Sequence, residues 1–137
     1  MSNPFITPIQ GEPDIRQTGI IKIKHSDTEL YPIARLTYEL FWNEEYQYIF
    51  EPFWDLIEQL PQGVWFGISG LDMDLHLPQY YRVNMVPCFM VQRTPDKNRQ
   101  DVHELMKSVG LDYYDRFEFL LRTTMMCGND NLIVERE

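Results

Sequence analysis

The sequence predicts an α+β fold in which a small, mainly antiparallel sheet packs against about three helices. Alternating apolar residues near the N-terminus predict a hairpin. Two helix-start signals and a final apolar run follow in the second half. The chain has 137 residues, of which 44% are hydrophobic and 14% aromatic, enough apolar material for one core. We therefore expect an irregular arm over residues 1–18 and a single domain over residues 19–137.

The predicted hairpin occupies residues 19–40. Residues 19–24 and 33–40 alternate in polarity as half-buried strands do, and the polar residues 25–29 form the turn between them. The arm before it carries three prolines and little periodicity, which is typical of irregular structure.

A short helix and a further strand are predicted next. Pro52 opens the helix, and Pro61 and Gly63 close it. Its shared apolar face consists of Phe53, Trp54, Ile57 and Leu60. The apolar run around Trp65 predicts another strand, followed by a bend at Gly67 and Gly70.

The next predicted helix has start and stop signals. Thr94 is placed to cap a helix whose first residue is Pro95, where the missing proline N–H costs nothing. Gly110 stands where a left-handed residue ends a helix. The inner face, at spacings of three and four, consists of Val102, Leu105, Met106 and Val109.

A last helix begins immediately afterwards. Asp115 and Glu118 form an acidic version of the capping box. Residues 128–131 predict a turn, and residues 132–134 predict a closing strand. The inner face of the helix consists of Phe117, Leu120, Leu121 and Thr124.

The order and spacing of these elements resemble a known family. From about Gly67 to Val134 the sequence resembles the small N-terminal subdomain of HipA-type serine/threonine kinases, the toxins of a bacterial toxin–antitoxin family. The matching positions are Pro87, Phe89, Arg99, Leu105, Gly110, Leu111, Asp115, Phe117, Leu120, Gly128 and residues 132–134. The family's Leu-Pro-Glu before the first helix is replaced by residues 93–96, and residues 129–131 replace small residues. Because the chain stops at Glu137, we expect the subdomain alone.

The resemblance implies a role for a free-standing subdomain. In split modules of this family, such a subdomain is an antitoxin or regulator of a separately encoded kinase, often beside a helix-turn-helix DNA-binding protein. The resemblance therefore implies a non-catalytic protein-binding module that binds a HipA-like kinase toxin and holds it inactive, without a cofactor.

The composition of the chain excludes some classes of binding partner and some cellular compartments. A formal net charge of −9 disfavours direct nucleic-acid binding, which depends on lysine and arginine. No apolar run reaches the ~18 residues of a membrane span, and no signal-peptide pattern is present, so we expect a cytoplasmic protein. Cys88 and Cys127 lack zinc-site spacing, and we expect both to be reduced and buried.

The motifs in the sequence give little support for a catalytic function. Asp72, Asp74 and His76 would project from one side of a strand. They would either hold a divalent cation or form a solvated face, and the solvated face is the simpler interpretation. Ser69 and Cys88 lie near His76 but without a nucleophile elbow, and phosphate loops and kinase motifs are absent. We expect no enzyme activity. The alternatives are a small metal-dependent enzyme using the Asp72, Asp74 and His76 set, and an acidic phage or plasmid protein that inhibits a host nucleic-acid-binding complex.

Aromatic residues are the remaining functional signal. The chain carries three tryptophans, eight tyrosines and eight phenylalanines, more than a core of this size needs, and aromatic and arginine residues dominate binding hot spots. The residues that flank predicted turns are expected to be exposed partner-binding anchors: Trp65, Phe66, Tyr80, Tyr81 and Arg82.

Overall fold

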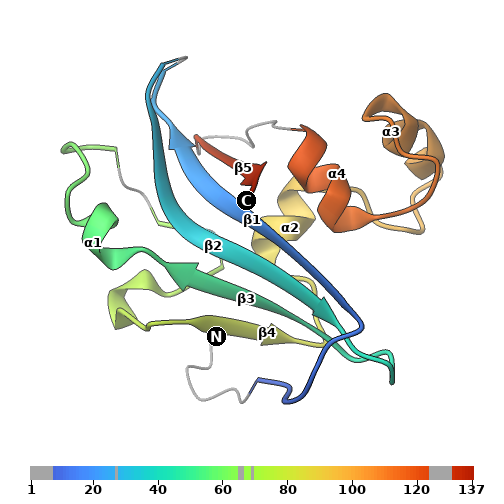
Figure 1. Cartoon of the computed structure of the whole chain (residues 1–137). Coiled ribbons are helices and arrows are strands. Elements are labelled where there is room, and N and C mark those ends of the chain that lie inside the picture. Colours follow the sequence, from blue (N-terminus) through green and yellow to red (C-terminus); the bar gives the residue numbers. More distant parts are fainter. Residues whose placement is uncertain (1–7, 27, 65–66, 69, 124–130) are drawn as a thin grey trace.

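The α+β prediction is confirmed by the computed structural model, which describes residues 8–26, 28–64, 67–68, 70–123 and 131–137. In this part of the chain, five antiparallel strands form one sheet in the order β4-β3-β2-β1-β5 (Figure 1). The strands are β1 (Ile15–Lys24), β2 (Leu30–Leu40), β3 (Tyr46–Pro52), β4 (Tyr80–Val83) and β5 (Leu132–Arg136). The described helices are α1 (Trp54–Ile57), the 3₁₀-helix η1 (Met73–Leu75), α2 (Cys88–Arg93), α3 (Val102–Ser108) and α4 (Arg116–Thr123).

The predicted N-terminal hairpin is confirmed and is longer than expected. β1 pairs with β2 from Ile15 opposite Leu40 to Lys24 opposite Leu30, with a register shift between Ile21 and Lys22. Residues 15–18, which we assigned to the irregular arm, are therefore strand. Their backbone groups bond to the long β2, so pairing determines their structure where side-chain periodicity gave no signal.

One interior strand of the sheet, β3, was not predicted. β3 lies between β2 and β4, and Gln47 and Tyr48 on its opposite faces are both buried. Burial on both faces weakens the contrast between polar and apolar positions on which strand prediction depends. The strand expected around Trp65 falls on residues 65–66, outside the described part of the chain, and neighbouring Val64, Gly67 and Ile68 are not in a strand.

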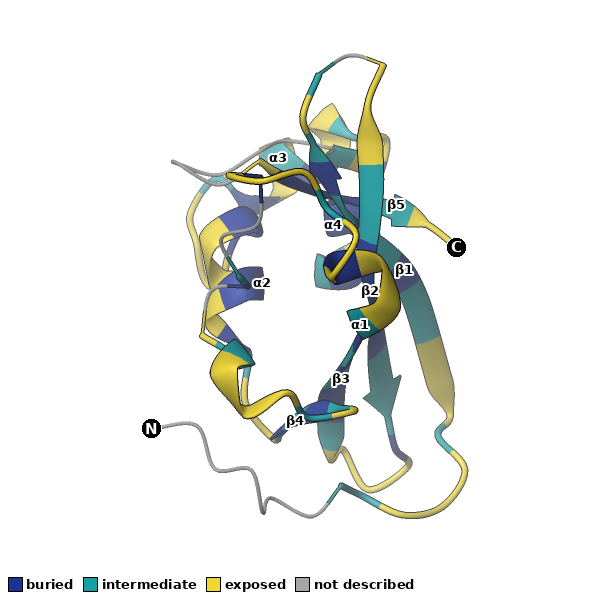
Figure 2. Ribbon diagram, turned by 90° about the vertical axis from the view of Figure 1, so that its left-hand side faces the viewer, coloured by how far each residue is buried: buried dark blue, intermediate teal, exposed yellow. Residues whose placement is uncertain are grey.

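The main core lies between one face of the sheet and the helices α2 and α4 (Figures 1 and 2). Alternate sheet residues supply one side of this core, among them Ile21, Leu36 and Phe50. Phe89 from α2 and Phe117 from α4 supply the other side, and Phe89 meets Phe50 edge to face at 6.0 Å. A smaller cluster joins α3 to α4 through Val102, Met106, Leu111 and Phe119.

The expected N-cap at Thr94 is wrong. Residues 88–93 form α2, Thr94 follows its C-terminal end, and its hydroxyl donates to the carbonyl of Met90. The next helix, α3, begins only at Val102. The physical reason is that Phe89 and Met90 are completely buried, so core packing stabilises a helix before Thr94 that is too short to give a periodic signal.

The other helix signals of the second half are confirmed. Gly110 follows α3 with φ +83°, and Leu111 N donates to Met106 O at 2.9 Å. Asp115 Oδ1 accepts from Glu118 N at 2.9 Å, as a cap of α4 does. Thr124 and the turn residues 128–130 lie outside the described residues, and β5 confirms the closing strand.

The N-terminal segment before β1 meets the opposite face of the sheet. Ile9 N donates to Gln47 Oε1 at 2.8 Å, and Gln47 Nε2 donates to Ile9 O at 3.3 Å. Gln47 also donates to Glu39 Oε1 at 2.7 Å. These bonds account for a glutamine that is only 1% exposed within a sheet.

Candidate functional site

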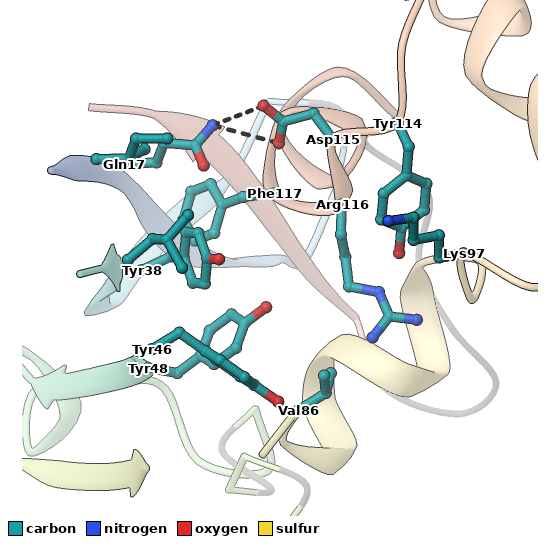
Figure 3. A pocket seen from close by; sticks show the side chains of 12 residues that line it. Gln17, Tyr38, Tyr46, Tyr48, Val86, Lys97, Tyr114, Asp115, Arg116 and Phe117 are labelled. Carbon is teal, nitrogen blue, oxygen red and sulfur yellow. Dashed lines mark hydrogen bonds between the residues drawn. The ribbon is translucent and has the colours of Figure 1, made fainter. Parts of the chain in front are cut away.

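A pocket of about 530 Å³ opens at one end of the sheet, on the face that carries the core (Figure 3). The beginnings of β1 and β3 and the end of β2 form one wall. The segment that enters α4 forms the opposite wall, and Val86 and Lys97 complete it. Antiparallel pairing brings these strand ends together, because Ile15 lies opposite Leu40 and Leu40 opposite Tyr46. We call this cavity the tyrosine pocket.

Aromatic rings cover the sheet side of the tyrosine pocket. Tyr38 lies 5.0 Å from Tyr48 between ring centroids and stacks on Phe117 at 6.3 Å with an interplanar angle of 24°. Tyr46 meets Tyr48 edge to face at 6.2 Å. The rings contact one another in offset and edge-to-face geometries, which makes a continuous and rigid apolar wall.

The opposite side of the tyrosine pocket is polar. Asp115 accepts two hydrogen bonds from Gln17 Nε2, at 3.3 and 3.2 Å, in addition to capping α4. Arg116 donates to Pro95 O through Nε at 3.4 Å and through Nη2 at 3.1 Å. Tyr114 also donates to Pro95 O, at 3.0 Å, so one carbonyl fixes both side chains.

Three of the pocket tyrosines, Tyr38, Tyr48 and Tyr114, stay neutral to high pH. Burial raises the pKa of Tyr48 far above its ordinary value, and the nearby Tyr38 phenol adds to the rise while the Arg116 charge opposes it. Burial likewise raises the pKa of Tyr38 and of Tyr114. Neutral phenols offer O–H donors rather than phenolate nucleophiles, so these groups are suited to binding.

Three exposed apolar side chains lie at the same end of the sheet as the tyrosine pocket. Ile15 is 47% exposed at the start of β1, Trp42 is 81% exposed in the β2–β3 turn, and Met85 is 47% exposed just after β4. The register places them together, since Gln47, near the start of β3, lies opposite Val83 at the end of β4. We call Ile15, Trp42 and Met85 with the mouth of the pocket the hairpin-end surface.

Of the five predicted anchors, two are buried. Tyr80 is 1% exposed and Arg82 is 6% exposed, because their positions on β4 face the core opposite Phe50 and Tyr48. Tyr80 donates to Asp72 O at 2.7 Å, and Arg82 donates to Gly70 O at 2.7 Å, so both hold the preceding loop in place. Tyr81 faces the other side of the sheet and is half-buried. Trp65 and Phe66 lie outside the described residues and stay predictions.

The proposed arrangement of Asp72, Asp74 and His76 on a strand is wrong. Asp72 precedes η1 and accepts from Asp74 N at 3.2 Å, and His76 ends η1 with φ +49°. The His76 ring stacks on Trp54 at 4.1 Å and does not join the two carboxylates. Among the described residues, no group of three histidine, cysteine or acidic side chains is arranged to hold a metal ion.

Cys88 also differs from its prediction. It is exposed at the first turn of α2, while its neighbour Phe89 fills the core. A six-residue helix directs adjacent side chains to different faces, and Phe89 occupies the inner one. Cys127 lies outside the described part of the chain.

Comparison with family models, with curated proteins and with solved structures gives no match for this chain. In the described residues, no helix is long and apolar enough to span a membrane. Sequence reasoning missed the tyrosine pocket, although the alternation of Tyr46 and Tyr48 was a visible signal. The pocket depends on strand register between distant segments, which that signal does not specify.

Proposed function

We propose that this chain is a non-catalytic cytoplasmic module that binds a separately encoded HipA-like serine/threonine kinase and inhibits it, as an antitoxin or regulator. The observation that supports binding is the exposed Trp42 beside the tyrosine pocket. The resemblance in residues 67–134 supports a kinase as the partner and a helix-turn-helix protein as a third component.

Trp42 is presented by an ordered turn. Phe41 N donates to Glu45 O at 2.8 Å, Glu44 N donates to Phe41 O at 2.9 Å, and Glu44 has φ +70°. The Asn43 side chain accepts from Glu45 N at 3.2 Å. A tryptophan fixed on a tight turn loses little conformational freedom on binding, and its large ring buries much apolar surface, which are properties of hot-spot residues.

The hairpin-end surface also fits a protein partner in character. It combines exposed apolar groups with a pocket of tyrosines, and both classes of side chain are enriched at interface centres. Trp65 and Phe66 remain sequence-predicted contributors to the same role. Inhibition would follow from occupying a surface that the kinase needs for substrate binding or closure.

Affinity capture from the native host tests this proposal. Tagged wild-type protein, a Trp42→Ser variant and a Leu30→Ser variant are used as baits, and bound proteins are identified by mass spectrometry. Leu30 is the matched control, since it is 38% exposed at the opposite end of the β1–β2 hairpin. We expect a HipA-like kinase with the wild type and with Leu30→Ser, and little or none with Trp42→Ser.

Washing at high salt separates this proposal from the charge-mimic alternative. Contacts made by apolar and aromatic groups persist at roughly 1 M salt, whereas contacts between exposed opposite charges are screened. Retention of the kinase at high salt is the expected result. Recovery of nucleic-acid-binding proteins that wash off in salt, without any kinase, would contradict the proposal.

A further inference from the structure

We propose that the tyrosine pocket binds a small molecule that carries one aromatic ring and one anionic group. This inference does not depend on the kinase partner. The volume of the tyrosine pocket, about 530 Å³, lies within the range of small-ligand sites, roughly 300–1,000 Å³. The walls combine many apolar groups with a few polar groups, as such sites do.

The aromatic wall supplies a place for a planar ring. Tyr38, Tyr46, Tyr48 and Phe117 form consecutive ring contacts between 5.0 and 6.3 Å. In the described part of the chain, the hydroxyls of Tyr38, Tyr46 and Tyr48 make no hydrogen bond to another residue. Free O–H donors beside an apolar wall can bind an acceptor on the ligand without breaking any bond of the protein.

Two cations at the tyrosine pocket favour an anionic group. Arg116 and Lys97 line it, and within the described residues neither forms a salt bridge. Arg116 donates through Nε and Nη2 to Pro95 O, which is an uncharged acceptor and leaves the charge of Arg116 without compensation there. These two cations line one cavity in a chain whose formal net charge is −9.

The positions of the charges orient the ligand. Figure 3 shows Arg116 and Lys97 on one side and Asp115 with Gln17 on another. The rings of Tyr46 and Tyr48 extend from β3 toward the side that holds Arg116. Asp115 repels an anion from its own end, so the anionic group is placed at Arg116 and the ring lies against the tyrosines.

Isothermal titration calorimetry of the full chain tests this inference with defined probes. Phenyl phosphate and 4-hydroxybenzoate carry the ring with a phosphate or with a carboxylate, so the two arms distinguish these sources of negative charge. Phenol lacks the anion, and inorganic phosphate lacks the ring. We expect saturable binding of at least one aryl anion and much weaker binding of phenol and of inorganic phosphate.

Variants of the two cations locate the binding. Arg116→Gln is expected to weaken the aryl anion by at least about tenfold, because a charge-assisted bond is lost. Arg122→Gln is the control on the same helix, where Arg122 pairs with Glu118 at 3.0 Å, and is expected to leave affinity within about twofold. Lys97 is exposed, so Lys97→Gln is expected to fold. This variant replaces Arg116→Gln in the test if Arg116→Gln does not fold.

Several results would overturn the inference. The inference is wrong if neither phenyl phosphate nor 4-hydroxybenzoate binds at millimolar concentration. It is also wrong if phenol or inorganic phosphate binds as tightly as these two aryl anions. Unchanged affinity in folded Arg116→Gln, or in Lys97→Gln when the first variant is unfolded, would place any bound probe elsewhere.

Discussion

Gly19 is the residue of β1 that allows the sheet to approach α4 closely. A Cβ at this position would lie 2.7 Å from Leu121 Cδ2 and 2.8 Å from Val134 Cγ1. Both neighbours are buried core groups with little room to move. The absence of a side chain here is therefore a packing requirement, and not a matter of backbone conformation.

Substituting Gly19 by alanine is expected to lower the free energy of unfolding by about 1–3 kcal/mol through overpacking. Urea denaturation monitored by circular dichroism measures this change. Thr18→Ser, on the opposite face of the same strand, serves as the control, with an expected change below about 1 kcal/mol. Equal stability of Gly19→Ala and wild type would show that β1 and α4 are not packed as described.

Thr94 distinguishes the sequence prediction from the structure. A Thr94→Asp variant would be tolerated at a helix N-cap, where aspartate is favoured. At the C-terminal end of α2, however, the side chain is 8% exposed and directed at the carbonyl of Met90. A carboxylate there is directed at a carbonyl oxygen, to which it cannot donate, so we expect a loss of about 2 kcal/mol or more in unfolding free energy. A variant as stable as wild type in thermal melting would favour the N-cap instead.

Whole-element predictions succeeded where a local signal and the tertiary structure agree. Asp115 and Glu118 predicted the start of α4 because capping is a local interaction. β3 and α2 were missed since one is buried on both faces and the other spans only six residues. Their structure is determined by packing against distant segments, which sequence periodicity does not contain.

A cluster of charges joins α4 to β5. Glu118 accepts from Arg122 at 3.0 Å and from Arg136, and its side chain is only 12% exposed. The hydrogen bond from Arg136 is the largest cause that lowers the pKa of Glu118, and Arg122 adds to it. A carboxyl whose folded pKa is lowered contributes stability above its unfolded pKa, near 4.5, and that stability is lost as the pH falls through the folded pKa.

Glu118→Gln is accordingly expected to destabilise the protein by about 0.5–1 kcal/mol at pH 7, with a smaller difference from wild type at pH 3. Urea unfolding at the two pH values gives the comparison. Glu104→Gln on the exposed side of α3 is the control. A difference between Glu118→Gln and wild type that does not shrink on acidification would rule out the ion pairs as its cause.

The aromatic wall of the tyrosine pocket is expected to lose stability as the pH rises, whereas the Glu118 cluster loses stability as the pH falls. The raised pKa of Tyr48 means that its neutral form is favoured by folding, so this stability is complete below pH ~10 and is lost as the pH rises further. Tyr48→Phe cannot ionise and should lose less stability than wild type between pH 8 and 11. Tyr113→Phe, at a side chain that is 58% exposed, should follow wild type in the same urea titration. If the free energy of unfolding falls equally with pH in Tyr48→Phe and in wild type, the burial of the Tyr48 phenol is contradicted.

At the scale of the molecule, the fold class was predictable and the candidate site was not. The α+β pattern follows from alternation and capping, which are local. The hairpin-end surface brings together residues near positions 15, 42, 85 and 116, and only the order and register of the strands make them neighbours. Arg82 illustrates the difficulty, since a residue beside a predicted turn was expected to be exposed but faces the core.

Trp42 connects this architecture to the proposed role. With 81% of the residue exposed, Trp42→Ser should change the unfolding free energy by no more than about 0.5 kcal/mol. A thermal melt of the variant that coincides with wild type is the expected result. A large loss of stability would mean that Trp42 supports the fold and is not a free binding anchor.

The most direct test of the central claim is a titration of the purified host HipA-like kinase with this protein, in which affinity and kinase activity are measured together. The account predicts saturable binding with loss of kinase activity, an affinity at least about tenfold weaker for Trp42→Ser, and no change for Leu30→Ser. A kinase that neither binds the protein nor loses activity in its presence would contradict the account.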